Sequence, residues 1–268
     1  MTDPSSTGGV VLVGCGRLGS AVLEGWLATA AVAPGDLIIL TPSEKPSAEA
    51  ARGRGARINP PSKALSGARA LVLAVKPAKW REALGPVLAT LSPDTTIVSV
   101  MAGVMAGDIA ALTGRPVARV MPTTGVAQAR GVAALWSADI EARETARGLF
   151  GAIADIVDLE SEDLMDAATA VAGSAPAFIH AFVQALARAG QAQGLSAEAA
   201  QRLARGALRS AGAGAETGEP LDALIARVAS PGGTTRAGLD AIEATGDLDR
   251  AAEAAVEAAV QRARTISG

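Results

Sequence analysis

"GGVVLVGCGRLGSAVLEGWLA", from Gly8 to Ala28, joins a short β-branched run to an amphipathic helical pattern through a glycine turn. The apolar run predicts a buried strand, and the spacing of apolar residues after the turn predicts a helix. Between them, "GCGRLG" has the G-x-G-x-x-G spacing of a dinucleotide-binding turn. Gly14 would allow the tight turn, Gly16 the approach of a pyrophosphate, and Gly19 close packing of the helix. The alternative is a glycine-rich turn without a ligand, in which Cys15 is a small filler residue.

Further strand patterns follow, and each ends in small or polar residues. Strands that alternate with helical segments predict parallel βαβ units and a doubly wound α/β sheet. From about Glu162 the strand patterns stop, and alanine-rich helices continue to the end of the chain. We therefore expect a Rossmann domain over residues 1–160 and an all-helical domain over residues 161–268. The predicted strands after the first are "DLIIL", "ARALVLAVKP", "TTIVSVMAG", "RPVARVMP", "GVAALWSA" and "ADIVDLE".

The end of the second predicted strand indicates which cofactor is used. An NAD enzyme places an acidic residue there to bind the ribose 2′-hydroxyl. This chain instead has Thr41, Pro42 and Ser43, followed by Lys45. A hydroxyl and a cation suit a 2′-phosphate, so NADPH is favoured over NADH. The alternative is a solvated loop whose lysine is incidental.

Composition excludes several other chemistries. The net charge of −3 argues against a nucleic-acid partner. The chain has no Tyr, a single His (His180) and a single Cys (Cys15), so a Tyr-x-x-x-Lys site, a His–His metal site and an intrachain disulfide are excluded. The N-terminal "MTDPSSTGG" has no signal-peptide pattern, and no uninterrupted apolar run is long enough to cross a bilayer. We expect a cytoplasmic protein with no bound metal and no membrane partner.

"GSAPAFIH", which begins at Gly173, places glycine and proline inside a helical pattern where both are costly. Small residues at this place would let a flat ring lie against the helix. A close crossing of two helices explains them equally well, and periodicity does not separate the two interpretations. His180 could share the face of Gly173, although a packed or solvated histidine is the commoner case.

"VASPGGTTRAGL", Val228 to Leu239, interrupts the helical region with two glycines. Ser230 followed by Pro231 predicts an N-cap and the first residue of a helix. The amides of residues 232–235 would then form an anion site that two residues without side chains leave open. The alternative is an ordinary junction between a loop and a helix.

These motifs together resemble the pyrroline-5-carboxylate reductase family along nearly the whole chain. They are "GCGRLG", "LAVKP", "SVMAGV", "RVMP", "GSAPAF", "ETG" and "SPGGTTRAGL". The resemblance implies NAD(P)H-dependent reduction of the cyclic imine 1-pyrroline-5-carboxylate to L-proline, the last step of proline biosynthesis. It also implies that the helical domain forms a homodimer or a higher homo-oligomer built from dimers, in which the partner completes each active site.

The resemblance assigns roles position by position. Thr235 matches the threonine proposed to hydrogen-bond the imine nitrogen, and is the predicted catalytic residue. The predicted substrate-binding residues are Ser174, Ser230, Gly232, Gly233, Thr234 and Thr235. The residues predicted to bind the cofactor are Gly14, Cys15, Gly16, Arg17, Leu18, Gly19, Ser43, Lys45, Ser62, Ala74, Val75, Lys76, Pro77, Ala102, Gly103 and Thr123.

Three positions depart from the family pattern. Thr123 stands where the family usually has asparagine, Ala175 where it has glycine, and Ser62 where an asparagine is expected. Each change affects the surroundings of the cofactor, and the SPGGTT stretch is intact.

Two other functions remain open at this point. One is a related reductase acting on another imine or on a small hydroxy acid. The other is a dinucleotide-binding protein without catalysis. A protonated imine is already electrophilic, so its reduction needs orientation more than a dedicated acid or base. That requirement suits a chain without Tyr.

Overall fold

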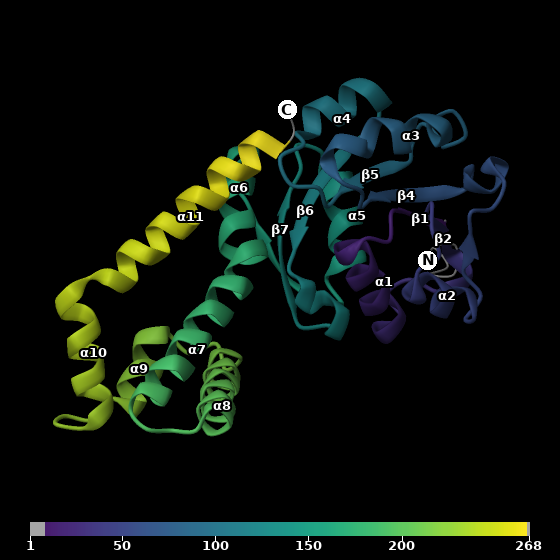
Figure 1. Cartoon of the computed structure of the whole chain (residues 1–268). Helices are drawn as coiled ribbons and strands as arrows, with labels where there is room; N and C mark the ends of the chain where they lie inside the picture. Colours follow the sequence, from purple (N-terminus) through teal and green to yellow (C-terminus); the bar gives the residue numbers. More distant parts are fainter. Residues whose placement is uncertain (1–8, 267–268) are drawn as a thin grey trace. The chain divides into compact units, whose positions relative to one another are not determined.

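The computed structural model describes residues 9–266 (Figure 1). The expectation that the N-terminal tail carries no signal peptide falls largely on residues 1–8, outside the described residues. The chain divides into two compact units. The first runs to Gly173 and takes in the chain again from Ala259, and the second is Ser174–Ala258. The domain boundary predicted between residues 160 and 161 is not a boundary of these units and stays a prediction.

The first unit is built on one sheet, which has eight strands within residues 9–266, in the order β3-β2-β1-β4-β5-β6-β7-β8. The order 3-2-1-4-5-6 of its first six strands is that of a Rossmann fold, and its direction reverses between β1 and β4. The strands are β1 (Gly9–Val13), β2 (Leu37–Leu40), β3 (Arg57–Ile58), β4 (Ala68–Leu73), β5 (Thr96–Ser99), β6 (Val117–Pro122), β7 (Gly131–Trp136) and β8 (Ala154–Asp158).

Helices cover both faces of this sheet, as Figure 1 shows. Val10 and Leu12 of β1 pack in the apolar layer of α1, α2 and α5, whereas Val11 and Val13 pack in the layer of α3 and α4. The doubly wound fold is therefore confirmed. The helices are α1 (Arg17–Thr29), α2 (Pro46–Arg52), α3 (Trp80–Leu88), α4 (Ala106–Thr113), α5 (Ile140–Phe150) and α6 (Met165–Ala168); single turns lie at Pro34–Asp36, Ser62–Leu65, Pro77–Lys79, Thr124–Gln128 and Glu162–Leu164.

Two features of the sheet differ from the prediction. The two-residue strand β3 was not predicted, because it is too short to carry a periodic pattern. Strand β7 runs antiparallel to β6, whereas all the strands were expected to be parallel. Only a short stretch with one 3₁₀ turn, Thr124–Gln128, separates them, and a parallel crossover needs a dozen residues or more.

The second unit is helical, with α7 (Ala175–Ala192), α8 (Ala197–Ala215), α9 (Leu221–Val228), α10 (Thr234–Thr245) and most of α11 (Asp247–Ile266). Helices α7 and α8 meet through Ala187, Ala200 and Ala204. The GSAP segment lies at the junction between a π-helical turn and α7, within one continuous helical stretch. A π-helical turn, Thr169–Ser174, precedes α7, and Pro176 lies in the first turn of α7, where proline costs little.

One helical stretch, Glu162–Ala192, is long and apolar enough to cross a membrane by length and composition. The expectation from uninterrupted apolar runs did not find this stretch, because its mean hydropathy comes from alanine and larger apolar residues that polar and small residues interrupt. Only 11% of its most apolar window is buried. Most of its apolar side chains are therefore left uncovered by this single chain, with Met165, Ala170 and Ala187 as buried exceptions.

Gly25 in α1 provides a test of the packing between α1 and the Thr124–Gln128 turn. A Cβ at Gly25 would lie 2.2 Å from the carbonyl oxygen of Val126. Gly25→Ala should therefore lower the free energy of unfolding by about 1–3 kcal/mol, despite the better helix propensity of alanine. Urea unfolding followed by tryptophan fluorescence measures this, since Trp26, Trp80 and Trp136 all belong to the first unit.

Gly148→Ala in α5 is the matched control, because a Cβ there would meet nothing within 4 Å. It should raise the stability by about 0.5–1 kcal/mol. Equal effects of the two substitutions would contradict the packing explanation.

Candidate active site

The glycine turn after β1 has the geometry that a bound pyrophosphate requires. Gly14 has φ +97°, and its N–H donates to the carbonyl of Leu40 at 2.8 Å. A Cβ at Gly19 would lie 2.1 Å from the oxygen of Gly14, so only glycine fits there. A Cβ at Gly16, in contrast, would point into open space. The turn brings α1 tightly onto the sheet and leaves one side open to a ligand.

Helix α1 directs unused donors toward that side. Its N-cap, Gly16, has no side chain, and its first turn contains no acidic residue. The first i→i−4 bond is made by the N–H of Ser20, so the amides of Arg17, Leu18 and Gly19 precede the helical ladder. Free amides and the positive end of the helix dipole favour an anion. The residues present therefore fit the pyrophosphate of a dinucleotide.

Cys15 lies inside the turn and is buried. Burial raises the pKa of its thiol to about 11, and the nearby Lys45 ammonium lowers it by less. The thiol is therefore protonated at neutral pH and is a poor nucleophile. This agrees with the interpretation of Cys15 as a small filler residue inside the turn.

A pocket of about 240 Å³ lies at the carboxyl ends of β1, β4, β5 and β6. This is where open α/β sheets bind ligands. It brings together several residues that the sequence predicted, whereas Val100, Met101, Met121 and Ile266 were missed. The motifs "SVMAGV" and "RVMP" pointed to the regions of the first three, but no pattern marked the last turn of α11. The lining residues are Leu18, Ala74, Val75, Pro77, Val100, Met101, Ala102, Met121 and Ile266.

Lys76 and Gly103 adjoin this pocket in the chain without lining it. Lys76 is the N-cap of the Pro77–Lys79 turn. Gly103 has φ +73°, a backbone conformation that glycine adopts at little cost. Their predicted roles in cofactor binding stay predictions.

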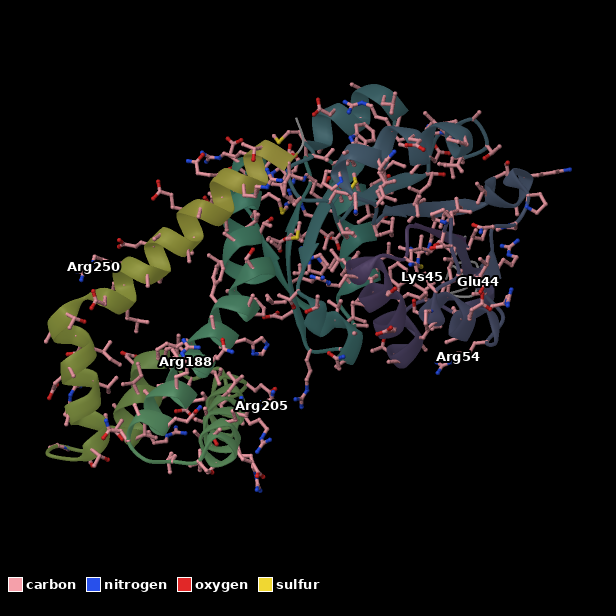
Figure 2. The ribbon with its side chains drawn as sticks, in the orientation of Figure 1. Glu44, Lys45, Arg54, Arg188, Arg205 and Arg250 are labelled. Carbon is pink, nitrogen blue, oxygen red and sulfur yellow. The ribbon has the colours of Figure 1, made fainter. Side chains whose placement is uncertain are left out.

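A second pocket, of about 310 Å³, adjoins the end of β2. Ser43 and Lys45 line it as expected, together with Glu44, which Figure 2 labels beside Lys45. Arg52 also lines it and forms an ion pair with Glu49. The pocket thus contains two cations and two acids, and Arg52 was not predicted.

Asn59 lines this second pocket and hydrogen-bonds the backbone of Thr41. Its side-chain amide donates to the carbonyl of Thr41 at 2.8 Å, and its Oδ1 accepts from the N–H of Thr41 at 3.0 Å. Asn59 has φ +45°, a conformation that asparagine tolerates better than most residues. It lies three residues before Ser62, which is exposed and does not line the pocket.

Thr123 follows the end of β6, and its polar groups are used by the sheet. Its N–H donates to the carbonyl of Val132 at 2.9 Å, and its Oγ1 accepts from the N–H of Val132 at 3.2 Å. Its contribution to cofactor binding stays a prediction.

The SPGGTT segment forms a turn in which Ser230 is not the N-cap. The N–H of Gly233 donates to the carbonyl of Ser230 at 3.0 Å, with Pro231 and a Gly232 of φ +69° between them. Proline followed by a glycine of positive φ is the pattern of a type II turn. Helix α10 therefore starts after Gly233, its N-cap, and the expected start at Pro231 is wrong.

This start changes which donors are available. Gly233 uses its own N–H within the turn, and the first helical bond runs from Ala237 to Gly233 at 3.1 Å. The amides of Thr234, Thr235 and Arg236 precede that bond. The predicted cluster of amides 232–235 therefore loses that of Gly233 to the turn, and the free amides at the helix start are those of residues 234–236. The Arg236 side chain forms ion pairs with Asp240 and Glu243, each at 2.6 Å.

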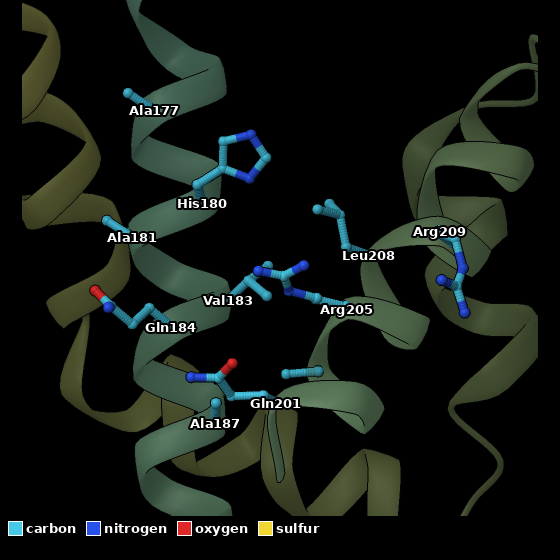
Figure 3. A pocket seen from close by; sticks show the side chains of 11 residues that line it. Ala177, His180, Ala181, Val183, Gln184, Ala187, Gln201, Arg205, Leu208 and Arg209 are labelled. Carbon is cyan, nitrogen blue, oxygen red and sulfur yellow. The ribbon is translucent and has the colours of Figure 1, made fainter. Parts of the chain in front are cut away.

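The remaining predicted substrate residue, Ser174, is half-buried at the end of the π-helical turn, directly before α7. His180 lies further along α7 and lines a groove of about 790 Å³ between α7 and α8. Figure 3 shows its ring directed toward Leu208 and Arg205 of α8. Among residues 9–266, no group of three or more His, Cys, Asp and Glu could hold a metal ion.

Two family models match separate parts of the chain. Residues 162–266 match the family model of pyrroline-5-carboxylate reductase dimerisation. Residues 9–103 match that of NADP oxidoreductase, coenzyme F420-dependent.

Individual relatives cover almost the entire chain. The pyrroline-5-carboxylate reductase of Thermus thermophilus is 35% identical over 264 residues, which cover 96% of this chain and 98% of that protein. A pyrroline-5-carboxylate reductase structure from Coxiella burnetii has a TM-score of 0.87 at 25% identity, covering 98% of this chain and all of the other. The Plasmodium falciparum pyrroline carboxylate reductase, solved with NADP bound, shares the fold with a TM-score of 0.80 at 23% identity, over 98% of this chain and 99% of that one. The chain therefore belongs to the pyrroline-5-carboxylate reductase family.

Proposed function

We propose that this protein uses NADPH to reduce 1-pyrroline-5-carboxylate to L-proline. The observation that carries the proposal is the SPGGTT turn, where uncapped amides of α10 and two threonine hydroxyls combine an anion site with a neutral hydrogen-bonding group. Similarity to pyrroline-5-carboxylate reductases over nearly the full length supports it. The direct test is NADPH oxidation on addition of 1-pyrroline-5-carboxylate, with L-proline identified as the product.

The substrate carboxylate would bind the amides of Thr234 and Thr235 at the positive end of α10. Gly232 and Gly233 keep that approach open, and the Ser230 hydroxyl borders it. The Thr235 hydroxyl would hydrogen-bond the ring nitrogen. Holding the ring at both points presents one face of its C=N bond. Orientation of this kind can supply much of the catalysis for an electrophile that is already activated.

The glycine turn, the 240 Å³ pocket and the 310 Å³ pocket would hold the pyrophosphate, the nicotinamide and the adenosine ribose of the cofactor, respectively. When bound, NADPH supplies the hydride. Lys45 would bind the 2′-phosphate, and the Ser43 hydroxyl would add a hydrogen bond. The backbone of residues 74–77 and 102–103 would surround the reactive end.

We further propose a cytoplasmic homodimer, or a larger assembly of dimers. Ile179, Phe182 and Leu186 are 44–49% exposed and share one face of α7. Exposed apolar surface of this kind marks an interface, and the segment belongs to the stretch that matches the dimerisation family. A second subunit would also cover the apolar stretch Glu162–Ala192.

Lys45→Ala should reduce the preference for NADPH over NADH by about 10- to 100-fold. A charge-assisted hydrogen bond to the phosphate contributes about 1.5–3 kcal/mol, which NADH does not gain. Steady-state kcat/KM with each cofactor measures the ratio. Arg54→Ala is the control, because Arg54 donates to the carbonyl of Leu27 and does not line the pocket. A wild-type enzyme that uses NADH equally well would refute the assignment.

Thr235→Val should lower kcat by about 10- to 100-fold, because the lost hydroxyl bond matters most in the transition state. Thr235→Ser should recover most of this loss. If His180→Phe is inactive while Thr235→Val is fully active, the proton comes from the histidine instead.

Gly233→Val should mainly raise the KM for the imine, because even a Cβ at this position would lie 2.7 Å from the Ser230 Oγ and disturb the turn. NADPH binding, measured without substrate, should stay intact.

Light scattering should show a particle at least twice the 26.6 kDa chain mass. The double variant Phe182→Glu, Leu186→Glu should dissociate it, because charges at an apolar interface are costly. Leu112→Glu on α4 is the control, with similar exposure in the first unit. A stable and active monomer of the wild-type chain would refute the proposal.

A further inference from the structure

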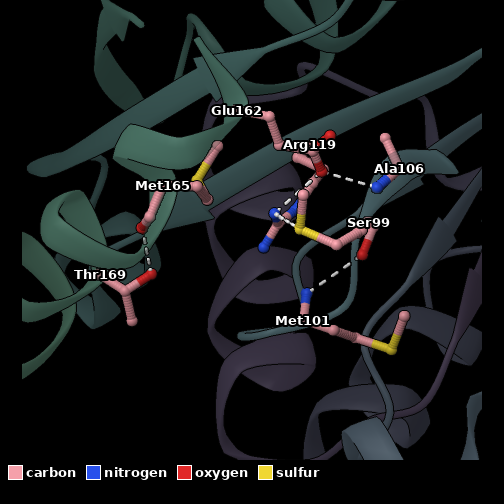
Figure 4. Close-up of polar contacts among 8 residues, drawn as sticks. Ser99, Met101, Ala106, Arg119, Glu162, Met165 and Thr169 are labelled. Atoms are coloured by element: carbon pink, nitrogen blue, oxygen red, sulfur yellow. Dashed lines mark hydrogen bonds and ion pairs between the residues drawn. The ribbon is translucent and has the colours of Figure 1, made fainter. Parts of the chain in front are cut away.

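Arg119 is a buried cation in the middle of the sheet. It lies on β6, opposite Ser99 of β5 and Trp136 of β7, and is only 1% exposed. Its Nη1 donates to Oε1 of Glu162 at 3.0 Å (Figure 4). Its Nε and Nη2 have no partner within the described residues. Because a buried charge is costly without a partner, Arg119 depends on the carboxylate of Glu162.

The same carboxylate oxygen caps a helix from far along the chain. Oε1 of Glu162 accepts from the N–H of Ala106, the first residue of α4, at 2.6 Å. The N-cap of α4 is Met105, whose side chain makes no capping bond. A carboxylate at this end also complements the helix dipole. Glu162 therefore satisfies a buried guanidinium and a helix start at once.

The loop that these bonds hold forms part of the 240 Å³ pocket. It connects β5 to α4, and its Met101 and Ala102 line the pocket. At its beginning, Ser99 Oγ accepts from the N–H of Met101 at 3.3 Å. At its end, Arg119 Nη1 lies 3.8 Å from the Met105 sulfur. Arg119 and Glu162 thus hold the end of the loop, whereas its beginning is held locally by Ser99.

The strand that carries Arg119 contributes to the pocket directly. Met121 lines the pocket two residues further along β6, on the same face of the strand as Arg119. Met121 also packs with Met165, three residues after Glu162. One layer of the first unit therefore joins Arg119, Glu162 and the wall of the pocket.

We infer that Arg119 and Glu162 are positioning residues for the nicotinamide end of the cofactor: their ion pair and the Glu162–Ala106 bond fix the loop that forms the pocket wall. The inference rests on the proposed function, which places the nicotinamide in this pocket. Glu162 is the first residue of the stretch that matches the dimerisation family, although it lies in the first unit.

The test measures NADPH binding without substrate, by quenching of tryptophan fluorescence, beside kcat and the KM for the imine. Glu162→Ala should raise the Kd for NADPH by about 10-fold and lower kcat by about 10- to 100-fold, because misplacement of a supporting group by about 1 Å has effects of this size. The KM for the imine should stay within about twofold. Glu162→Gln keeps an acceptor for the N–H of Ala106 and should restore part of the lost affinity for NADPH.

A double variant, Arg119→Met, Glu162→Leu, separates positioning from folding. Replacing a buried ion pair by apolar residues is often neutral for stability, but the bond to Ala106 is lost. This variant should melt near the wild-type temperature and still bind NADPH about 10-fold more weakly. Arg147→Met is the matched control, since it removes an exposed pair with Asp158 in the same unit and should change neither value.

The outcomes are distinguishable. If the double variant is folded and binds NADPH as the wild type does, the pair is structural only and the inference is wrong. If the wild type binds NADPH but does not turn over 1-pyrroline-5-carboxylate, the proposed function fails while the binding test of Arg119 and Glu162 still stands. Only one outcome supports the inference: the double variant stays folded and binds NADPH more weakly than the wild type.

Discussion

The cofactor side of the molecule depends on the contact between the start of α1 and the end of β1. A side chain on Gly19 would overlap the carbonyl of Gly14, and one on Gly14 would lie 2.7 Å from the carbonyl of Ala74 at the end of β4. Three backbone segments therefore meet where the strand order reverses. The amides of α1 and the two flanking pockets are placed by this contact.

Helix starts serve different purposes along this chain. α5 and α8 are capped by their own neighbours, with Asp139 accepting from Ala142 and Ser196 from Ala199. α1 and α10 begin instead at Gly16 and Gly233, which have no side chain to occupy the first amides. We propose that these two helices bind the anionic groups of cofactor and substrate. A glycine N-cap costs only a few tenths of a kcal/mol relative to a polar cap, so the donors remain free at little loss of stability.

The sequence was informative wherever one local rule determines the structure. The glycine turn, the buried strands and the helical region follow from spacing alone. Local rules failed at Ser230, where an N-cap signature coincides with a type II turn. They also could not find Arg52, Asn59 or Ile266, because pocket membership arises from contacts between distant segments. The Glu162–Ala106 cap spans 56 residues and left no local pattern.

The helical unit buries few of its side chains within a single chain. Within its described residues, α9 and α10 have no buried residue and α7 has one, Ala187. Helices in water gain most of their stability from packing of an apolar face rather than from propensity. The turn that we propose binds substrate starts α10, so its geometry is only as stable as the packing of that helix. A second subunit that buries these faces would therefore fix the substrate site as well as the fold. In such an assembly, loss of the interface would weaken substrate binding even where every residue that contacts the substrate is intact.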